Sequence, residues 1–197
     1  EQFEDDFEGD GRRFYTDGRH VHEFLKELTA DTGLDNYVTV GEMSSTSLEN
    51  CIRYSDPEEK ELSMCFNFHH LKVDYKDGKK WELMEPDRMK LKELFETWGT
   101  GMQEAGGWNA LFWCNHDQPR TVSRLGDEGR YWAKSAKMLA ASIHLMRGTP
   151  YIYQGEEIGM TNPHFADIKQ YRDVESLNYY RILLEQGKTS SEAMEIL

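Results

Sequence analysis

The sequence lacks the features that mark disulfide-rich, zinc-binding, membrane-spanning and nucleic-acid-binding proteins. Its 197 residues include only three cysteines, widely spaced and without a Cys-x-x-Cys pair, which indicates neither a disulfide framework nor a zinc site. No segment approaches the roughly 20 consecutive apolar residues of a membrane helix. Basic residues are outnumbered 23 to 36 by acidic ones, and the net charge of −13 argues against general binding to nucleic acid or a membrane surface.

The start of the chain carries a mild acidic cluster, Glu4, Asp5, Asp6 and Glu8, where a secretory signal would be basic and then apolar. With 38% hydrophobic and 30% charged residues, the composition is that of a globular protein with enough apolar material for a core. Reduced thiols fit the same picture. We therefore expect a cytoplasmic protein whose cysteines are packed in its interior.

Apolar periodicity predicts strands alternating with helices. Short apolar or β-branched runs predict strands at 37–40, 62–68, 109–114 and 149–155. Helical spacing predicts helices at 19–31, from 86 onward, at 129–147 and around 177–184, and Thr46 with Glu49 has the spacing of a capping box that opens another. Helices between successive strands predict an α/β fold with a parallel sheet and right-handed crossovers.

Polar residues gather just after each expected strand. These groups are Gly41-Glu42, His69-His70, Asn115-His116-Asp117 and Gln154-Gly155-Glu156-Glu157. In a parallel sheet the carboxyl ends of the strands lie at one face, where active sites form. Four strand-helix units are half of an eight-unit barrel, and a half barrel leaves two open edges that favour self-association.

Glu42 and Asp117 are the carboxylates that best fit a catalytic role. Each alone could be a loop acid or a helix cap, but both follow strands directly, and Asp117 is flanked by Asn115 and His116, which can donate hydrogen bonds to hydroxyl groups. Aromatic residues that could face a sugar ring lie nearby in sequence, at Phe112, Trp113, Tyr151 and Tyr153. Glycoside hydrolysis needs a carboxylic acid for the leaving oxygen and carboxylates that stabilise an oxocarbenium-like transition state. Cys114 could be a nucleophile, but burial is the expected role.

Three long stretches, "VTVGEM", "FWCNHDQPR" and "GTPYIYQGEEIGMTN", resemble the α-glucosidase branch of the α-amylase superfamily, glycoside hydrolase family thirteen. The resemblance covers essentially the whole chain. It implies a retaining enzyme on a (β/α)8 TIM barrel, of which residues 1–197 would be the C-terminal half, about strands five to eight, as one partial catalytic domain. The first half and the small inserted domain have no match here.

The resemblance implies a role for each matching residue. Glu42 in "VGEM" matches the general acid/base, Asp117 in "NHD" matches the transition-state stabiliser, and His116 matches the histidine that assists it by binding substrate. Glu156 and Glu157 match a segment whose role is structural. The family's nucleophile lies in a Gly-x-Arg-x-Asp stretch on strand four, and no such stretch exists in this sequence. We therefore expect these residues to be inactive by themselves.

Within this branch, "GDGRRFYTDG", "VGEMSSTSLENC" and above all "FNFHHLKVDY" match members that act on a phosphorylated disaccharide, whereas members acting on isomaltose-type sugars usually carry an acidic residue at the position of His69. A phosphate monoester adds between one and two negative charges, which cations would attract. The candidates are His69, His70 and Lys72. Each could instead be structural, and Lys79 and Lys80 have the character of solvated turn residues.

Two other interpretations stay open. An oligo-1,6-glucosidase or dextran glucosidase would share Glu42 and Asp117 but not the phosphate-binding cations. A non-catalytic carbohydrate-binding domain of the same fold would have lost the acids that this chain retains. No cofactor and no metal site is expected, because nothing in the sequence supplies a coordination set.

Overall fold

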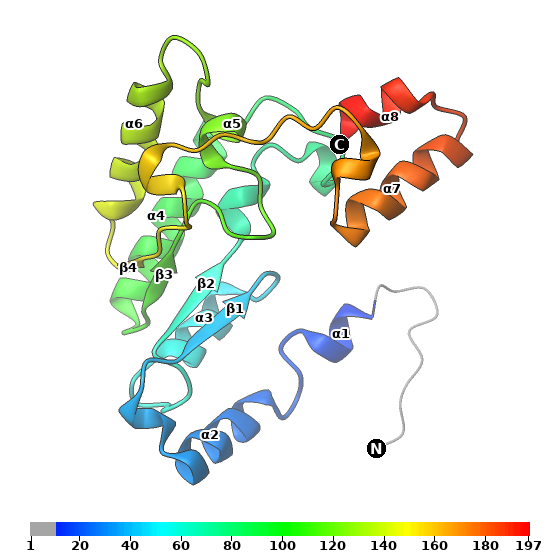
Figure 1. Cartoon of the computed structure of the whole chain (residues 1–197). Coiled ribbons are helices and arrows are strands. Elements are labelled where there is room, and N and C mark those ends of the chain that lie inside the picture. Colours follow the sequence, from blue (N-terminus) through cyan, green and yellow to red (C-terminus); the bar gives the residue numbers. More distant parts are fainter. Residues whose placement is uncertain (1–10) are drawn as a thin grey trace.

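The computed structural model describes residues 11–197, and the acidic cluster and the first two residues of "GDGRRFYTDG" lie outside them. Four short strands form one parallel sheet in sequence order (Figure 1): β1 (Val40–Met43), β2 (Met64–Asn67), β3 (Asn109–Leu111) and β4 (Thr149–Pro150). Helices separate successive strands. The predicted α/β class with a parallel sheet is therefore confirmed.

The helices found in the described residues are α1 (Arg12–Tyr15), α2 (Val21–Thr32), α3 (Leu48–Ser55), α4 (Arg88–Glu104), α5 (Thr121–Leu125), α6 (Trp132–His144), α7 (Val174–Glu185) and α8 (Ser190–Ile196). Short 3₁₀ turns lie at Leu34–Asn36, His69–Lys72, Lys76–Gly78, Glu156–Ile158 and Ile168–Gln170. No helix in residues 11–197 is long and apolar enough to cross a membrane.

The first strand begins later than predicted. Tyr37 and Val38 are 70% and 73% exposed, and the ladder with β2 starts only where Val40 lies opposite Met64. The β-branched run at 37–40 suggested a strand, but strand formation depends on a neighbour to pair with, which sequence alone does not show. Glu42 consequently lies within β1 and not after it.

The predicted cap of α3 is also wrong by one residue. Ser47, not Thr46, caps the helix, because the Ser47 side chain accepts a hydrogen bond from the Asn50 amide at 3.3 Å. The Thr46 hydroxyl is buried and donates to Asp17 at 3.2 Å, a residue 29 positions earlier in the chain. The sequence did not predict α8, although Thr189 and Glu192 form a complete capping box there.

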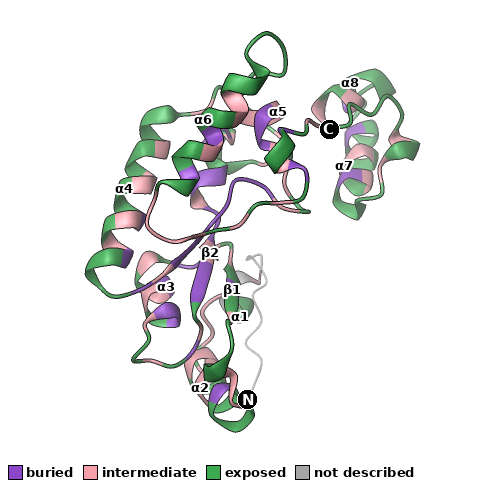
Figure 2. Ribbon diagram, turned by 60° about the vertical axis from the view of Figure 1, so that its left-hand side comes forward, coloured by how far each residue is buried: buried purple, intermediate pink, exposed green. Residues whose placement is uncertain are grey.

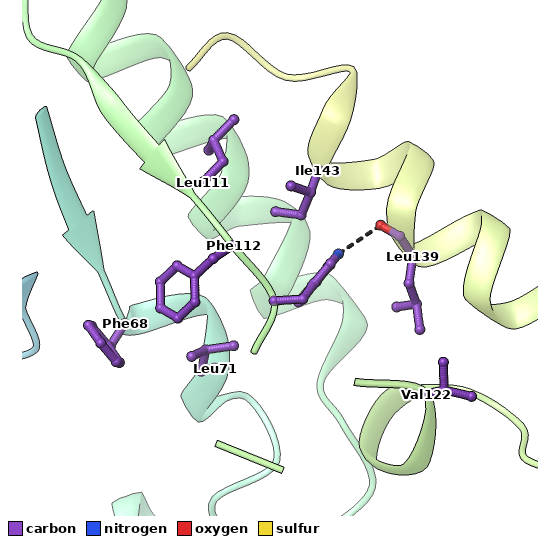
Figure 3. Packing of buried hydrophobic residues seen from close by; sticks show 8 residues of the cluster. Phe68, Leu71, Leu111, Phe112, Val122, Leu139 and Ile143 are labelled. Carbon is purple, nitrogen blue, oxygen red and sulfur yellow. Dashed lines mark hydrogen bonds between the residues drawn. The ribbon is translucent and has the colours of Figure 1, made fainter. Parts of the chain in front are cut away.

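Two hydrophobic clusters hold the helices against the sheet. One lies between β2, α3 and α4 and consists of Cys51, Tyr54, Cys65, Trp98 and Met102; Figure 2 shows α3 and α4 on the same side of the strands. The other joins the ends of β2 and β3 to α5 and α6 (Figure 3), and consists of Phe68, Leu71, Leu111, Phe112, Trp113, Val122, Leu139 and Ile143. In this cluster the Trp113 indole donates to the Leu139 carbonyl at 2.8 Å.

Candidate active site

Glu42 points away from the helices that cover the sheet. Successive residues of a strand face opposite sides of the sheet. Gly41 and Met43 face the cluster between β2, α3 and α4, so Glu42, which lies between them in β1, faces the other side. Glu42 is exposed and is paired in register with Phe66 of β2, whose ring packs edge-on against Phe112 and Tyr151. The acid therefore shares its face of the sheet with aromatic side chains.

A hollow of about 1090 Å³ lies beside β1, and Glu42 is among its lining residues. Asp17 lines the same hollow and adopts a left-handed conformation, with φ of 50°. Its carboxylate accepts hydrogen bonds from the Tyr54 hydroxyl at 2.9 Å and the Thr46 hydroxyl at 3.2 Å. Asp17 thereby fastens the segment before α2 to the loop after β1.

Asp117 and His116 extend from the carboxyl end of β3. Both side chains are mostly exposed, 62% and 71%, and His116 Nε2 lies 3.3 Å from Asp117 Oδ2. The backbone turns here because the Asp117 amide donates to the Asn115 side chain at 2.9 Å. The exposure leaves both groups accessible to a substrate.

His69 and Lys72 bind the loop that follows Glu42. His69 Nε2 donates to the Thr46 carbonyl at 3.0 Å, and the His69 ring stacks on Trp98 with centroids 5.0 Å apart. Lys72 Nζ donates to the Ser44 carbonyl at 2.9 Å and remains exposed. The structure thus brings two of the three predicted phosphate ligands to the same end of β1 as Glu42.

His70 does not lie where a phosphate ligand must lie. Its side chain is buried, contacts the rings of Phe95, Phe112 and Trp113, and donates from Nε2 to the Phe112 carbonyl at 2.7 Å. Burial lowers the pKa of His70 to about 4, so the ring is neutral near pH 7. A neutral, enclosed ring cannot offer a charge to a phosphate, and the expectation of direct contact is corrected to a structural role.

Lys79 and Lys80 are engaged with carboxylates. Lys79 Nζ contacts Glu82 at 2.8 Å and Lys80 Nζ contacts Glu175 of α7 at 2.5 Å. Trp81 stacks on Tyr179 of α7, with centroids 4.8 Å apart. The contacts of Lys80 and Trp81 fasten α7 to the turn between β2 and α4.

Two of the four aromatics expected near a sugar are core residues. Phe112 and Trp113 are 2% and 3% exposed and belong to the cluster between the sheet and α6. Tyr151 and Tyr153 are partly exposed, and the Arg120 guanidinium lies 4.8 Å from the Tyr153 ring centroid. Cys114 is buried and its pKa is raised by that burial, as expected of a structural thiol.

Arg124 is a residue near the site for which the sequence indicated no role. Its side chain, 9% exposed, forms a two-pronged ion pair with Asp74, through Nε to Oδ2 at 2.6 Å and Nη2 to Oδ1 at 2.5 Å. A buried pair joining residues 50 positions apart leaves no local pattern. Among residues 11–197 the structure assembles no group of three or more side chains suited to hold a metal.

The fold and the two strand-end acids define a class of protein. The chain belongs to the alpha-amylase family, because the family model "Alpha amylase, catalytic domain" matches residues 1–196. The predicted fold type is confirmed: structures of this family that resemble the chain are (β/α)8 barrel enzymes, of which it covers about a third.

Particular relatives include trehalose-6-phosphate hydrolases. That of Bacillus subtilis (strain 168) is 62% identical over 192 residues, which make up 96% of this chain and 34% of the relative. The crystal structure of the Bacillus licheniformis trehalose-6-phosphate hydrolase is 64% identical with a TM-score of 0.91, over 98% of this chain and 35% of that one. An oligo-1,6-glucosidase of Parageobacillus thermoglucosidasius is 47% identical over 94% of this chain and 33% of its own length. The chain spans about a third of the length of these relatives.

Proposed function

We propose that this chain forms one half of the catalytic barrel of a retaining glycoside hydrolase that cleaves trehalose 6-phosphate to glucose and glucose 6-phosphate. The observation that carries the proposal is the placement of Glu42 and Asp117. Both are exposed toward the carboxyl edge of a parallel sheet: Glu42 lies in β1, Asp117 follows β3, and β2 lies between these two strands. This edge is where α/β enzymes assemble their active sites.

Each acid has a distinct task in the proposed reaction. Glu42 protonates the glycosidic oxygen as the leaving sugar departs, and then deprotonates the water that releases the second sugar. Asp117 binds hydroxyls of the cleaved ring and stabilises the positive charge that develops there, and His116 assists beside it. The attacking carboxylate has no counterpart in these 197 residues, so hydrolysis requires a longer barrel that supplies it.

The phosphate of the substrate is proposed to bind at Lys72. Its ammonium is exposed and is held at the loop that follows Glu42, whereas His70 is buried and neutral. His69 supports that loop by donating to Thr46. The higher identity to trehalose-6-phosphate hydrolases than to the oligo-1,6-glucosidase favours the phosphorylated substrate.

A cytoplasmic setting and a role in trehalose catabolism belong to this proposal. All three thiols are free, and a reducing compartment keeps thiols in that state. The proposed chemistry is acid and base catalysis by carboxylates and needs no cofactor.

The experiment compares two substrates in the full-barrel enzyme that carries this chain. Replacing Lys72 with Ala removes a charge-assisted contact, so kcat/KM for trehalose 6-phosphate should fall about 10- to 100-fold. Hydrolysis of 4-nitrophenyl α-glucoside, which has no phosphate, should change by less than about twofold by the same reasoning. Lys92→Ala, an exposed lysine on α4, is the matched control and should leave both unchanged.

Other outcomes decide between the alternatives. An equal loss for both substrates means that Lys72 only supports the Ser44 loop, and the phosphate assignment fails. A wild-type enzyme that prefers isomaltose is an oligo-1,6-glucosidase. One that hydrolyses neither substrate but binds sugar is a non-catalytic carbohydrate-binding domain.

A further inference from the structure

The guanidinium of Arg124 joins two separate segments at the carboxyl edge of the sheet. Besides its ion pair with Asp74, it donates from Nη2 to the Leu71 carbonyl and from Nη1 to the Gln118 side chain at 3.1 Å. Leu71 and Asp74 belong to the segment after β2. Gln118 belongs to the segment after β3 that carries Asp117.

Asp117 depends on its backbone for its position. Its carboxylate is 62% exposed and contacts only a neighbour in sequence, His116, at 3.3 Å among the contacts found in residues 11–197. The adjoining residues anchor the segment instead. Both anchors follow Asp117 in the chain. Gln118 accepts from Arg124, and two residues later the Arg120 amide donates to Asn162 at 2.8 Å and its Nη1 donates to the Gln154 carbonyl at 2.6 Å.

An arginine suits this place because its planar fork satisfies both oxygens of Asp74 and still has donors for two further acceptors. Asp74 is 5% exposed on its side chain, so the pair is shielded from water and keeps a fixed geometry. The ion pair is therefore a rigid anchor, to which Gln118 attaches the exposed segment that carries Asp117.

We propose that Arg124 is a positioning residue for Asp117, which it holds at the reactive edge through Gln118 while Asp74 and Leu71 fix the guanidinium. The inference rests on the proposed function for what Asp117 does once in place. It adds that the segment after β2 sets the geometry of the acid after β3, so the two strand ends act as one unit.

The test is made at Gln118, because replacing Arg124 would leave Asp74 buried without its partner and destabilise the fold. Gln118→Met has similar size but replaces the amide oxygen with a thioether, which is only a weak acceptor, whereas Gln118→Glu keeps an oxygen facing Arg124. In the full-barrel enzyme, Gln118→Met should lower kcat for trehalose 6-phosphate about 10-fold, with KM changed by less than about twofold, because a misplaced stabiliser weakens the transition state more than the bound substrate. Gln118→Glu should restore most of the lost kcat, and the melting temperature should be similar in all three proteins.

Equal kinetics for Gln118→Met and wild type, or a loss that Gln118→Glu fails to restore, would overturn the positioning role. Hydrogen exchange of the peptide covering 115–120 gives a second readout that needs no activity. Exchange should become faster in Gln118→Met and not in Gln118→Glu, and unchanged exchange in Gln118→Met argues against the inference. If the wild-type enzyme cleaves no glucoside, the proposed function fails, and the exchange result alone decides whether Arg124 positions this segment.

Discussion

His70 shows how burial changes the chemistry of one side chain. The ring is enclosed by Phe95, Phe112 and Trp113, and its Nε2 is committed to a backbone carbonyl. An exposed histidine in the same segment would be partly charged at neutral pH and available to an anion. The same residue type therefore serves two purposes in consecutive positions, since His69 is only partly buried and supports the loop after β1.

The folded protein should lose stability in acid through His70. Its pKa is lowered from 6.5 to about 4 in the folded protein. Between pH 6.5 and pH 4 this histidine is therefore protonated in the unfolded chain but neutral in the folded chain. The contribution is complete above pH 6.5 and is lost as the pH falls toward 4, by at most about 3 kcal/mol. Urea unfolding at several pH values should show this slope, and His70→Gln, which keeps a donor but does not titrate, should flatten it. A slope unaffected by the substitution would contradict the prediction.

Glu42 should control turnover in the full-barrel enzyme. Because an amide cannot donate or accept the catalytic proton, Glu42→Gln should lower kcat by about 10²- to 10⁴-fold. Glu157→Gln is the matched control: this exposed strand-end carboxylate accepts from the Gly155 amide at 2.8 Å, and an amide oxygen can do the same. Steady-state kinetics with melting temperatures separate lost chemistry from lost folding. Near-normal turnover by Glu42→Gln would refute its role as acid.

Among the secondary-structure elements, α3 and α4 meet at a glycine. A methyl group on Gly101 would lie 2.5 Å from the Leu48 Cδ2 atom, whereas Gly99, two residues earlier in α4, has open space around it. The close approach at Gly101 lets α3 and α4 pack together beneath β2. The absence of a side chain is therefore needed for packing at Gly101 but not at Gly99.

Alanine substitutions should separate these two glycines. Gly99→Ala should stabilise the protein by about 0.5–1 kcal/mol, because alanine loses less backbone entropy in a helix. Gly101→Ala should be less stable than Gly99→Ala by about 1–3 kcal/mol, since Leu48 must shift to make room. Chemical denaturation of both variants measures the difference. Equal stability would mean that Leu48 adapts without cost.

At the scale of the whole molecule, β1 is an open edge. In the described part of the chain β1 pairs with β2 on one side, and nearby apolar side chains are exposed, including Tyr37 at 70%, Val38 at 73% and Phe24 at 64%. Unpaired strand edges next to apolar surface favour pairing with another chain. Self-association of these residues alone remains a prediction.

Sedimentation of the 197-residue chain over a range of concentrations should reveal this association. Val38→Lys places a charge beside the edge and should weaken self-association by about tenfold or more. Ile182→Lys on α7, also an exposed apolar residue, is the control and should have little effect. A chain that stays monomeric at all concentrations would contradict the prediction. Self-association that is weakened equally by both substitutions would show that β1 is not the contact.

The sequence by itself determined the class of fold and is sufficient to predict where two acidic residues lie in the sheet. Apolar periodicity reveals which residues are inside, and alternation of strand and helix is sufficient to predict a parallel sheet with Glu42 and Asp117 at its carboxyl edge. These features follow from local order along the chain.

Tertiary structure alone decided the contacts between distant residues. It left Tyr37 and Val38 outside the sheet and buried His70. It also directed the hydrogen bond of the Thr46 hydroxyl to Asp17 and paired Arg124 with Asp74. Each outcome depends on which groups meet after folding and on how much water remains around them. Burial and long-range partners arise only when the chain is packed, so no local pattern records them.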